Sequence, residues 1–250
     1  YTPLFRFLDF QTNPPSSDAS PPFIFMRAMV RSTIVIVAGV VGPAVGIGTT
    51  LLLHCDLIVA GRSATFMLPF VSLGLVPEFA SSRLLPAIMG RQRAARHLLL
   101  GDPFDADTAL GFGLVSEVVE DGEVADRARA YARRLREKPP RALARTRAMI
   151  VPDLQDIEAV IAHEAAIFAE ALKGPEFAEA AAAFFEYGAV VAKGDGVARG
   201  ILMAVGLFTT VTGILVGTDG FPFVLDDHAQ PIVALIALFA YHHAFQLKLH

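Results

Sequence analysis

One apolar stretch, residues 33–60, constrains the fold of this chain more than any other feature. It begins with TIVIVAGV (33–40), continues through GPAVGIG (42–48) and ends with TTLLLHCDLIVA (49–60). Its length would suit a membrane-spanning helix, but glycines and a proline interrupt it, and such residues mark turns. The pattern therefore predicts a strand buried on both faces, a tight loop and a buried helix. The interrupting residues are Gly39, Gly42, Pro43, Gly46 and Gly48.

The composition excludes several classes of protein. Hydrophobic residues make up 54% of the chain and charged residues 18%, which excludes a disordered protein. The net charge of −4 lacks the basic excess of nucleic-acid binders, so no nucleic-acid partner is expected. Cys55 is the single cysteine, which excludes an intramolecular disulfide and a cysteine-cluster zinc site. We expect Cys55 to act as a small buried hydrophobic residue.

The region downstream of the apolar stretch has mainly helical patterns. Asp105 is placed to cap a short helix, and Gly113 is placed to end it. Apolar residues recur at helical spacing in the longer segments. The expected helices span residues 91–100, 106–111, 123–137, 153–172 and 176–186, and a strand is expected over 114–119.

The pattern divides the chain into three parts. The first residue is Tyr1 rather than Met, so we expect a fragment or a processed product. Residues 1–10 resemble the end of an amphipathic helix, and QTNPPSSDASPP (11–22) has the composition of a linker. The uncharged segment 200–217 is about long enough to span a bilayer. The expected parts are 1–28 (partial helix and linker), 29–187 (main domain) and 188–250 (an apolar tail that is membrane-associated or foreign to the fold).

Residues 42–83 contain the features that suggest chemistry. A glycine loop between a strand and a helix presents backbone N–H groups at a helix N-terminus, where they stabilise negative charge. Further along, Glu78 lies between Pro77 and Phe79, and the nearest basic residue in sequence is Arg83. Apolar surroundings raise the pKa of a carboxyl group and make it a better proton shuttle. Glu78 is therefore the candidate acid/base, although an exposed loop glutamate would fit its local sequence too.

The block resembles the crotonase superfamily, the enoyl-CoA hydratase/isomerase family. The resemblance rests on the glycine loop, the C-D at 55–56, the S-A-T-F before a proline, and GDPFDADTALGFGLVSEVV (101–119). It covers roughly residues 30–187. It implies an α/β fold of the ClpP/crotonase type, which is a spiral of ββα units with a C-terminal helical layer. Here the fold would be N-terminally truncated and followed by the apolar tail.

The resemblance also implies a subtype. Hydratases of the family use two glutamates, and the matching positions here are Thr50 and Phe70. Neither side chain transfers a proton in that role, so hydration by the usual pair is not expected. What remains is Glu78 in LGLVPEFASS (73–82), which is similar to the single-glutamate Δ3,Δ2-enoyl-CoA isomerases. The expected enzyme shifts the double bond of a 3-enoyl-CoA to the 2-position, as in fatty-acid oxidation.

The same resemblance assigns the remaining roles. The backbone N–H of Ile47 would be one donor of the oxyanion hole. The second donor would belong to an A-F-x-x-G-x-D-like loop upstream, and residues 1–30 contain no such loop. The implied substrate is an acyl-CoA thioester, with no metal and no cofactor, and the implied assembly is a homotrimer or a dimer of trimers. The expected substrate-pocket residues are Gly46, Gly48, Thr50, Phe70 and Pro77.

Other interpretations stay open at this point. The chain could be hydratase-like, or an inactive crotonase scaffold that serves as an interaction or membrane-associated module. The glycines of the loop also fit a simple strand-to-helix turn. The expected location is the cytoplasm, or the peroxisome or mitochondrion of a eukaryote, with membrane association through 200–217 as a further option.

Overall fold

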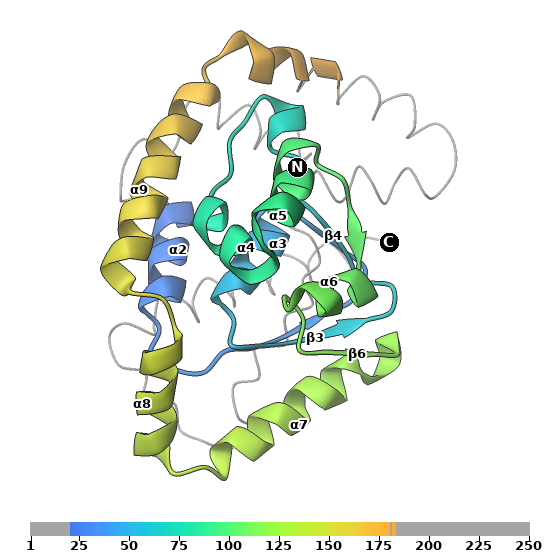
Figure 1. Cartoon of the computed structure of the whole chain (residues 1–250), viewed down its shortest axis with the longest axis vertical. Coiled ribbons are helices and arrows are strands. Elements are labelled where there is room, and N and C mark those ends of the chain that lie inside the picture. The colour runs from blue at the N-terminus through green and yellow to red at the C-terminus, as the bar shows by residue number, and fades with distance from the viewer. Residues whose placement is uncertain (1–20, 181, 184–250) are drawn as a thin grey trace, which may run out of the picture.

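The computed structural model describes residues 21–180, 182 and 183, and its strands form two small sheets (Figure 1). The first sheet has the order β1–β3–β6 and is parallel throughout. The second has the order β2–β4–β5, with β2 and β4 parallel and β4 and β5 antiparallel. The strands are β1 (Val37–Val40), β2 (Pro43–Val45), β3 (Leu57–Gly61), β4 (Thr65–Met67), β5 (Phe104–Asp105) and β6 (Glu117–Val119).

The chain alternates between the two sheets as it advances. It passes from β1 to β2, then through α3 (Ile47–Thr50) and the 3-10 helix η1 (Leu51–His54), and returns through β3 to β4. Each strand of the second pass lies parallel to its counterpart from the first, with Val37 opposite Leu57 and Pro43 opposite Thr65. This arrangement is the ββα spiral that the sequence predicts, and it confirms the α/β fold class.

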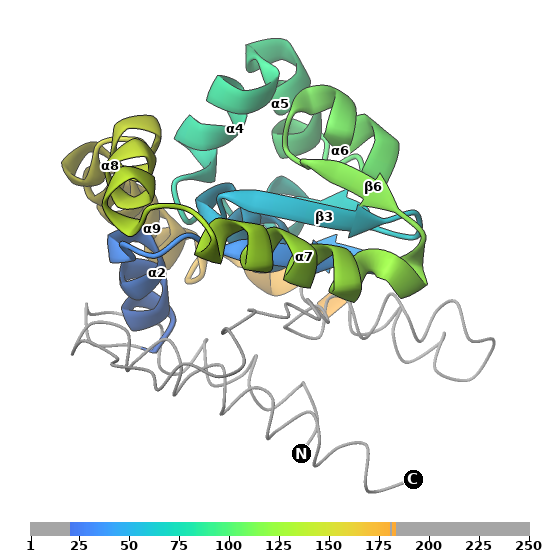
Figure 2. The ribbon, with the colours of Figure 1, turned by 90° about the horizontal axis from the view of Figure 1, so that it is seen from below.

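Both faces of the first sheet are buried. Successive side chains of a strand point to opposite sides, so the two faces pack against different elements. Ala38 and Ile58 face the main core, which also contains residues of α4 (Ser81–Met89), α5 (Arg91–Leu99) and α6 (Ala106–Phe112). Val37 and Val59 face α7 (Val124–Arg136) on the other side (Figure 2). A Cβ at Gly39 would lie 2.9 Å from Val124 Cγ1, so a glycine there allows α7 to lie close to the sheet.

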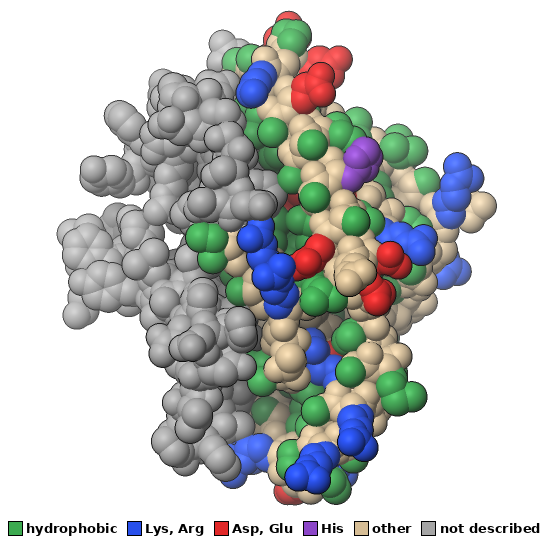
Figure 3. Space-filling model, turned by 90° about the vertical axis from the view of Figure 1, so that its left-hand side faces the viewer, with side chains coloured by type: hydrophobic (Ala, Val, Ile, Leu, Met, Phe, Trp, Pro, Cys, Tyr) green, Lys and Arg blue, Asp and Glu red, His purple; other side chains and the backbone are tan. Residues whose placement is uncertain are grey.

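The remaining helices form a layer at one side of the sheets. They are α2 (Pro21–Arg31), α8 (Pro140–Ile150) and α9 (Leu154–Ala171), and α2 packs on α9. Asp153 begins α9 as a cap, because its carboxylate accepts hydrogen bonds from the N–H groups of Gln155 and Asp156. Figure 3 looks onto this side of the molecule, where charges of both signs are interspersed with apolar side chains. This layer matches the predicted C-terminal helical layer, with α2 added to it.

The buried ion pair Asp56–Arg147 joins this layer to the sheet. Arg147 of α8 is 9% exposed, and its Nε lies 2.9 Å from both carboxylate oxygens of Asp56. Its Nη1 donates to the carbonyl oxygen of Ser32 at 2.6 Å, and Asp56 accepts the N–H of Ile36 at 2.7 Å. The pair therefore fixes α8 against both segments that lead into β1 and β3.

Several expected elements are confirmed. Helices lie over 91–99, 106–112, 124–136 and 154–171, and residues 175–180, 182 and 183 are helical as well. Asp105 caps α6 by accepting the Thr108 N–H at 2.8 Å, and Gly113 ends it with φ at 84°. The helices α4 and α8 were not predicted, and the strand expected over 114–119 spans only Glu117–Val119.

The prediction for residues 33–60 is wrong in three places. The first strand begins at Val37, since Ile34 is 60% exposed and lies outside the ladder. The predicted tight loop contains strand β2, and Leu57–Gly61 forms strand β3 rather than continuing a helix. Periodicity alone does not separate a short buried strand from a buried helix, and here parallel pairing with β1 selects the strand.

The C-terminal end of the expected N-terminal linker is also wrong. Residues 21 and 22 begin α2, which continues as one helix across the boundary expected at 28/29. The helix expected over 1–10 and the apolar segment 200–217 lie outside the described residues. Within the part of the chain that the structure describes, no helix is long and apolar enough to cross a membrane.

Candidate active site

A glycine turn between β2 and α3 forms one side of the site. Gly46 has φ 58° and ψ −121°, a conformation that is essentially restricted to glycine. A Cβ added there would meet no heavy atom within 4 Å, so the backbone conformation rather than a lack of space requires glycine. The Gly46 N–H donates to the Met67 carbonyl at 2.9 Å, and its carbonyl accepts the N–H groups of Thr49 and Thr50 at 2.9 and 3.0 Å. The turn is therefore fixed to both β4 and α3.

Ile47 is the first residue of α3. Its N–H is one of the amides that helix geometry leaves without an intrahelical acceptor. Its partly buried side chain packs in the cluster that contains Phe79, the residue after Glu78. The Ile47 side chain therefore lies near the segment that carries Glu78, and the oxyanion role of the Ile47 N–H stays a prediction.

The Glu78 side chain contacts α3 through a hydrogen bond with Thr50. The Thr50 hydroxyl, which is fully buried, donates to Glu78 Oε1 at 2.5 Å. Glu78 Oε2 is buried, and among the described residues it has no hydrogen-bond partner. Burial raises the pKa of Glu78 to about 8, the Thr50 hydrogen bond opposes that rise, and the charge of Glu164 adds to it. A carboxyl group with a pKa near working pH is suited to both accepting and donating a proton.

The turn that follows Glu78 is unusual in its backbone. Phe79 and Ala80 have φ values of 57° and 58°, which non-glycine residues rarely adopt. Ser81 Oγ donates to the Glu78 carbonyl at 2.6 Å. His54 Nε2 lies 2.8 Å from the Phe79 carbonyl oxygen, and the two rings stack with centroids 4.0 Å apart. Because a carbonyl only accepts, His54 carries its proton on Nε2.

Some of the residues predicted for the site lie at or beside Glu78, and Phe70 lies in the main hydrophobic core. Thr50 contacts Glu78 directly, and the Gly46 turn holds the Thr50 N–H. Pro77 is half-buried beside Glu78, and Gly48 is buried inside α3. Phe70 is 5% exposed and belongs to the main hydrophobic core. The assignment of these residues to a substrate pocket stays a prediction.

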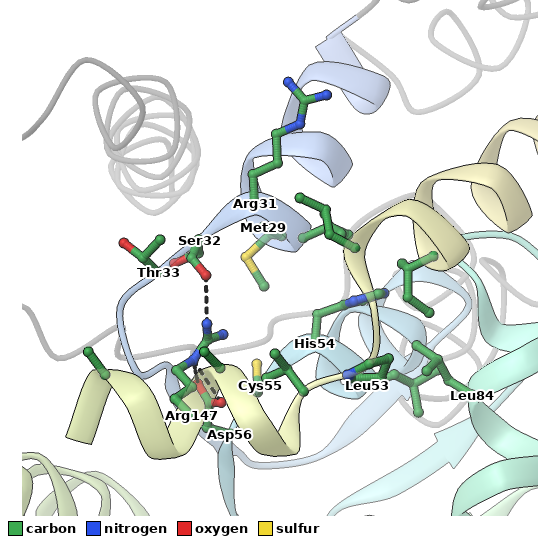
Figure 4. A pocket seen from close by; sticks show the side chains of 17 residues that line it. Met29, Arg31, Ser32, Thr33, Leu53, His54, Cys55, Asp56, Leu84 and Arg147 are labelled. Carbon is green, nitrogen blue, oxygen red and sulfur yellow. Dashed lines mark hydrogen bonds and ion pairs between the residues drawn. The ribbon is translucent and has the colours of Figure 1, made fainter. Parts of the chain in front are cut away.

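A cavity of about 370 Å³ lies elsewhere, between α2, η1, α8 and α9 (Figure 4). Its lining includes His54 and the pair Asp56–Arg147, but neither Glu78 nor the Gly46–Gly48 turn. His54 therefore lies between this cavity and the Phe79 carbonyl. The prediction that Glu78 forms the floor of an apolar pocket is not matched by this cavity.

Comparison with known proteins gives the family. The family model described as enoyl-CoA hydratase/isomerase matches residues 21–194. The chain belongs to the enoyl-CoA hydratase/isomerase family. Among solved structures of the family, that of Pseudomonas aeruginosa OdaA superposes with a TM-score of 0.68 at 45% identity, covering 71% of this chain and 73% of that one.

Two curated relatives from the family have named activities. The 1,2-epoxyphenylacetyl-CoA isomerase of Escherichia coli K12 is 38% identical over 114 residues, which is 46% of this chain and 44% of that protein. A probable enoyl-CoA hydratase of Bacillus subtilis 168 is 33% identical over 153 residues, which is 60% of this chain and 59% of that protein. The chain thus spans about half the length of the curated relatives it matches.

His54 makes the stability of the domain depend on pH. Burial lowers its pKa from 6.5 to about 4, so the unfolded chain binds a proton first as the pH falls. The stabilisation is therefore complete above pH ~6.5 and is lost towards pH ~4. We expect the free energy of unfolding to fall by about 2 kcal/mol between pH 7 and pH 5 through this group. In urea unfolding, the change in the free energy of unfolding of His54→Gln between pH 7 and pH 5 should therefore differ from that of the parent by about 2 kcal/mol, the variant losing less stability or gaining more as the pH falls.

His163→Gln is the matched control for this measurement, since His163 is exposed on α9. It should retain the pH dependence of the parent chain. A His54→Gln variant whose free energy of unfolding changes between pH 7 and pH 5 by the same amount as that of the parent would contradict the assignment to His54.

Proposed function

We propose that this chain carries the acid/base centre of an enzyme that shifts the double bond of a 3-enoyl-CoA to the 2-position. Glu78 would be its single proton-transferring residue. The observation that carries the proposal is the enclosed Glu78 carboxyl group, held by Thr50 where a hydratase of the family would have a glutamate. The acyl-CoA substrate is proposed from the family, whose named relatives act on CoA thioesters.

The two oxygens of Glu78 have different surroundings that suit this reaction. Oε1 accepts the Thr50 hydroxyl proton, which fixes the orientation of the carboxyl group. Oε2 has no partner among the described residues, so it is the oxygen that can receive a proton from C2 of the substrate and return it to C4. Removing the C2 proton places negative charge on the thioester oxygen, and the Ile47 N–H is the donor proposed to stabilise it. The reaction moves one proton and needs no redox cofactor.

The surroundings of Glu78 argue against hydration. Adding water to a 2-enoyl-CoA by the family's usual route uses two glutamates, one of them to activate the water. Here Thr50 is committed as a donor to Glu78, and Phe70 is a buried apolar residue. One carboxyl group remains, which is sufficient for moving a proton within the substrate.

An assay of the complete gene product with two substrates tests this proposal. We expect conversion of 3-enoyl-CoA to 2-enoyl-CoA, and hydration of 2-enoyl-CoA at least about 100-fold slower, the scale of one missing acid/base group. The absorbance of the conjugated thioester follows both reactions. Efficient hydration would contradict the isomerase subtype, and absence of both reactions would contradict the enzyme.

A further inference from the structure

The backbone directly after Glu78 is strained. Phe79 and Ala80 both lie in the left-handed region although neither is glycine. Each such residue costs about 1–3 kcal/mol and persists only where its surroundings hold it. Phe79 is 1% exposed and Ala80 is fully buried, so packing encloses both. Because the turn follows Glu78 directly, its conformation sets the position and direction from which the Glu78 side chain extends.

Glu164 of α9, which is 84 positions from Ala80 in sequence, binds this turn through its carboxylate. Its side chain is buried, with 5% of the residue exposed. Oε2 accepts the N–H of Ala80 at 2.6 Å, and Oε1 accepts the N–H of Ser82 at 3.0 Å. Both amides lie at the start of α4, where N–H groups lack intrahelical acceptors and a negative charge is favoured. One carboxylate thus binds the buried N–H of Ala80 and the partly buried N–H of Ser82, and fixes the turn between them.

Other contacts fix the same turn. The Glu78 carbonyl accepts the Ser81 N–H at 3.1 Å and the Ser81 hydroxyl at 2.6 Å. The Phe79 carbonyl accepts from His54 of η1, and the Phe25 ring of α2 lies 6.2 Å from the Phe79 ring. Only Glu164 binds the N–H side of the turn through a side chain from another element, among the residues that the structure describes.

We infer that Glu164 is a positioning residue for Glu78: by binding the N–H groups of Ala80 and Ser82 it holds the strained turn that places the Glu78 carboxyl group beside Thr50. The inference rests on the proposed function, since it assigns Glu164 to the acid/base centre without contact to substrate. A purely structural cap would change stability alone, whereas a positioning residue also changes the properties of Glu78.

The electrostatic effect of Glu164 gives a direct readout. Its negative charge disfavours ionisation of Glu78 and so raises the pKa of Glu78. Among the described residues packed against the turn, the other titratable side chains are His54, whose pKa is lowered to about 4, and Cys55, whose pKa is raised to about 12. Both are therefore neutral near pH 7. From α3 the side chain facing Glu78 is the uncharged Thr50. A change in the pKa of Glu78 on removing the charge at position 164 is therefore attributable to Glu164.

The first measurement needs no catalytic activity. Carbon NMR of the chain labelled in glutamate side chains gives the pKa of Glu78, and the spectrum of Glu78→Gln identifies its signal. We expect Glu164→Gln, which removes the charge and one of the two acceptors, to lower the pKa of Glu78. Glu170→Gln is the matched control, because Glu170 is an exposed glutamate of the same helix, and it should leave the pKa unchanged.

The second measurement uses the complete gene product and 3-enoyl-CoA. Glu164→Gln should lower kcat about tenfold or more while KM stays within about twofold, and should shift the limb of the kcat profile that reports Glu78 to lower pH. Glu164→Asp keeps the charge but draws the carboxylate back by one methylene, so it should lower kcat and leave the pKa of Glu78 near that of the parent. If Glu164→Gln does not fold, the Asp variant decides.

The outcomes separate the two ideas. A Glu164→Gln variant that melts earlier but keeps the parent's Glu78 pKa and pH profile would overturn the positioning role. So would a folded Glu164→Asp variant with unchanged kcat. If the parent does not isomerise 3-enoyl-CoA, the proposed function fails, and the NMR pKa still shows whether Glu164 controls Glu78.

Discussion

We expect that replacing Glu78 with glutamine lowers kcat for 3-enoyl-CoA isomerisation by about 10²-fold or more. Glutamine has nearly the same size and still offers an oxygen to the Thr50 hydroxyl, which donates to Oε1 in the parent chain. It neither accepts the C2 proton nor delivers one to C4. The loss should therefore appear in kcat, with KM changed little, because substrate contacts other than proton transfer remain.

The matched control is Glu123→Gln, which makes the same chemical change at an exposed position beside α7. Its kcat should equal that of the parent. Steady-state rates of both variants with 3-enoyl-CoA decide the matter. Undiminished isomerisation by Glu78→Gln would remove Glu78 from the proposed mechanism.

The contact between Thr50 and Glu78 shows how far the sequence could predict the site. The two residues are 28 positions apart, and the resemblance of the motifs around each to the family predicts that both belong to one site. The raised pKa of Glu78 also follows from its apolar neighbours in sequence, since burial is the main cause of the shift. The first feature follows from the resemblance to the family, and the second follows from the local composition around Glu78.

Glu164 shows what the sequence could not predict. It binds the N–H of Ala80 across 84 positions, and its own segment, HEAAIF, reads as an ordinary stretch of amphipathic helix. The Asp56–Arg147 pair, 91 positions apart, has the same character. Each contact depends on how α8 and α9 fold back onto the sheets, and no local pattern records that path. Left-handed φ at Phe79 and Ala80 is likewise unpredictable, because neither residue favours it.

The misassigned strand β3 has a different cause. Leu57–Gly61 is apolar and short, so its pattern fits a buried helix or a buried strand equally well. Parallel pairing with β1 on one edge and β6 on the other selects the strand. The fold class was nevertheless predictable, since it depended on the ordered motifs rather than on this one segment.

Replacing Glu78 with glutamine has a second large expected effect, which is on stability. The replacement should raise the free energy of unfolding at high pH, whereas it lowers kcat. Burial raises the pKa of Glu78 from 4.5 to about 8, so between these values the folded chain holds a proton that the unfolded chain has released. The contribution of this group to stability is therefore greatest below pH ~4.5 and falls as the pH rises towards 8. Through this group alone, the free energy of unfolding should fall by about 3–4 kcal/mol between pH 5 and pH 8.

Glu78→Gln removes this titration, because glutamine is neutral at every pH. The difference in the free energy of unfolding between the variant and the parent chain should favour the variant by about 3–4 kcal/mol more at pH 8 than at pH 5. Urea unfolding at both pH values measures this difference. Glu123→Gln, at its exposed position, should follow the parent at both pH values. Equal pH dependence in Glu78→Gln and the parent would mean that the carboxyl group titrates normally. A stability gain at pH 8 combined with lost turnover would indicate that the fold tolerates a destabilising buried carboxyl group at the position where the proposed chemistry needs one.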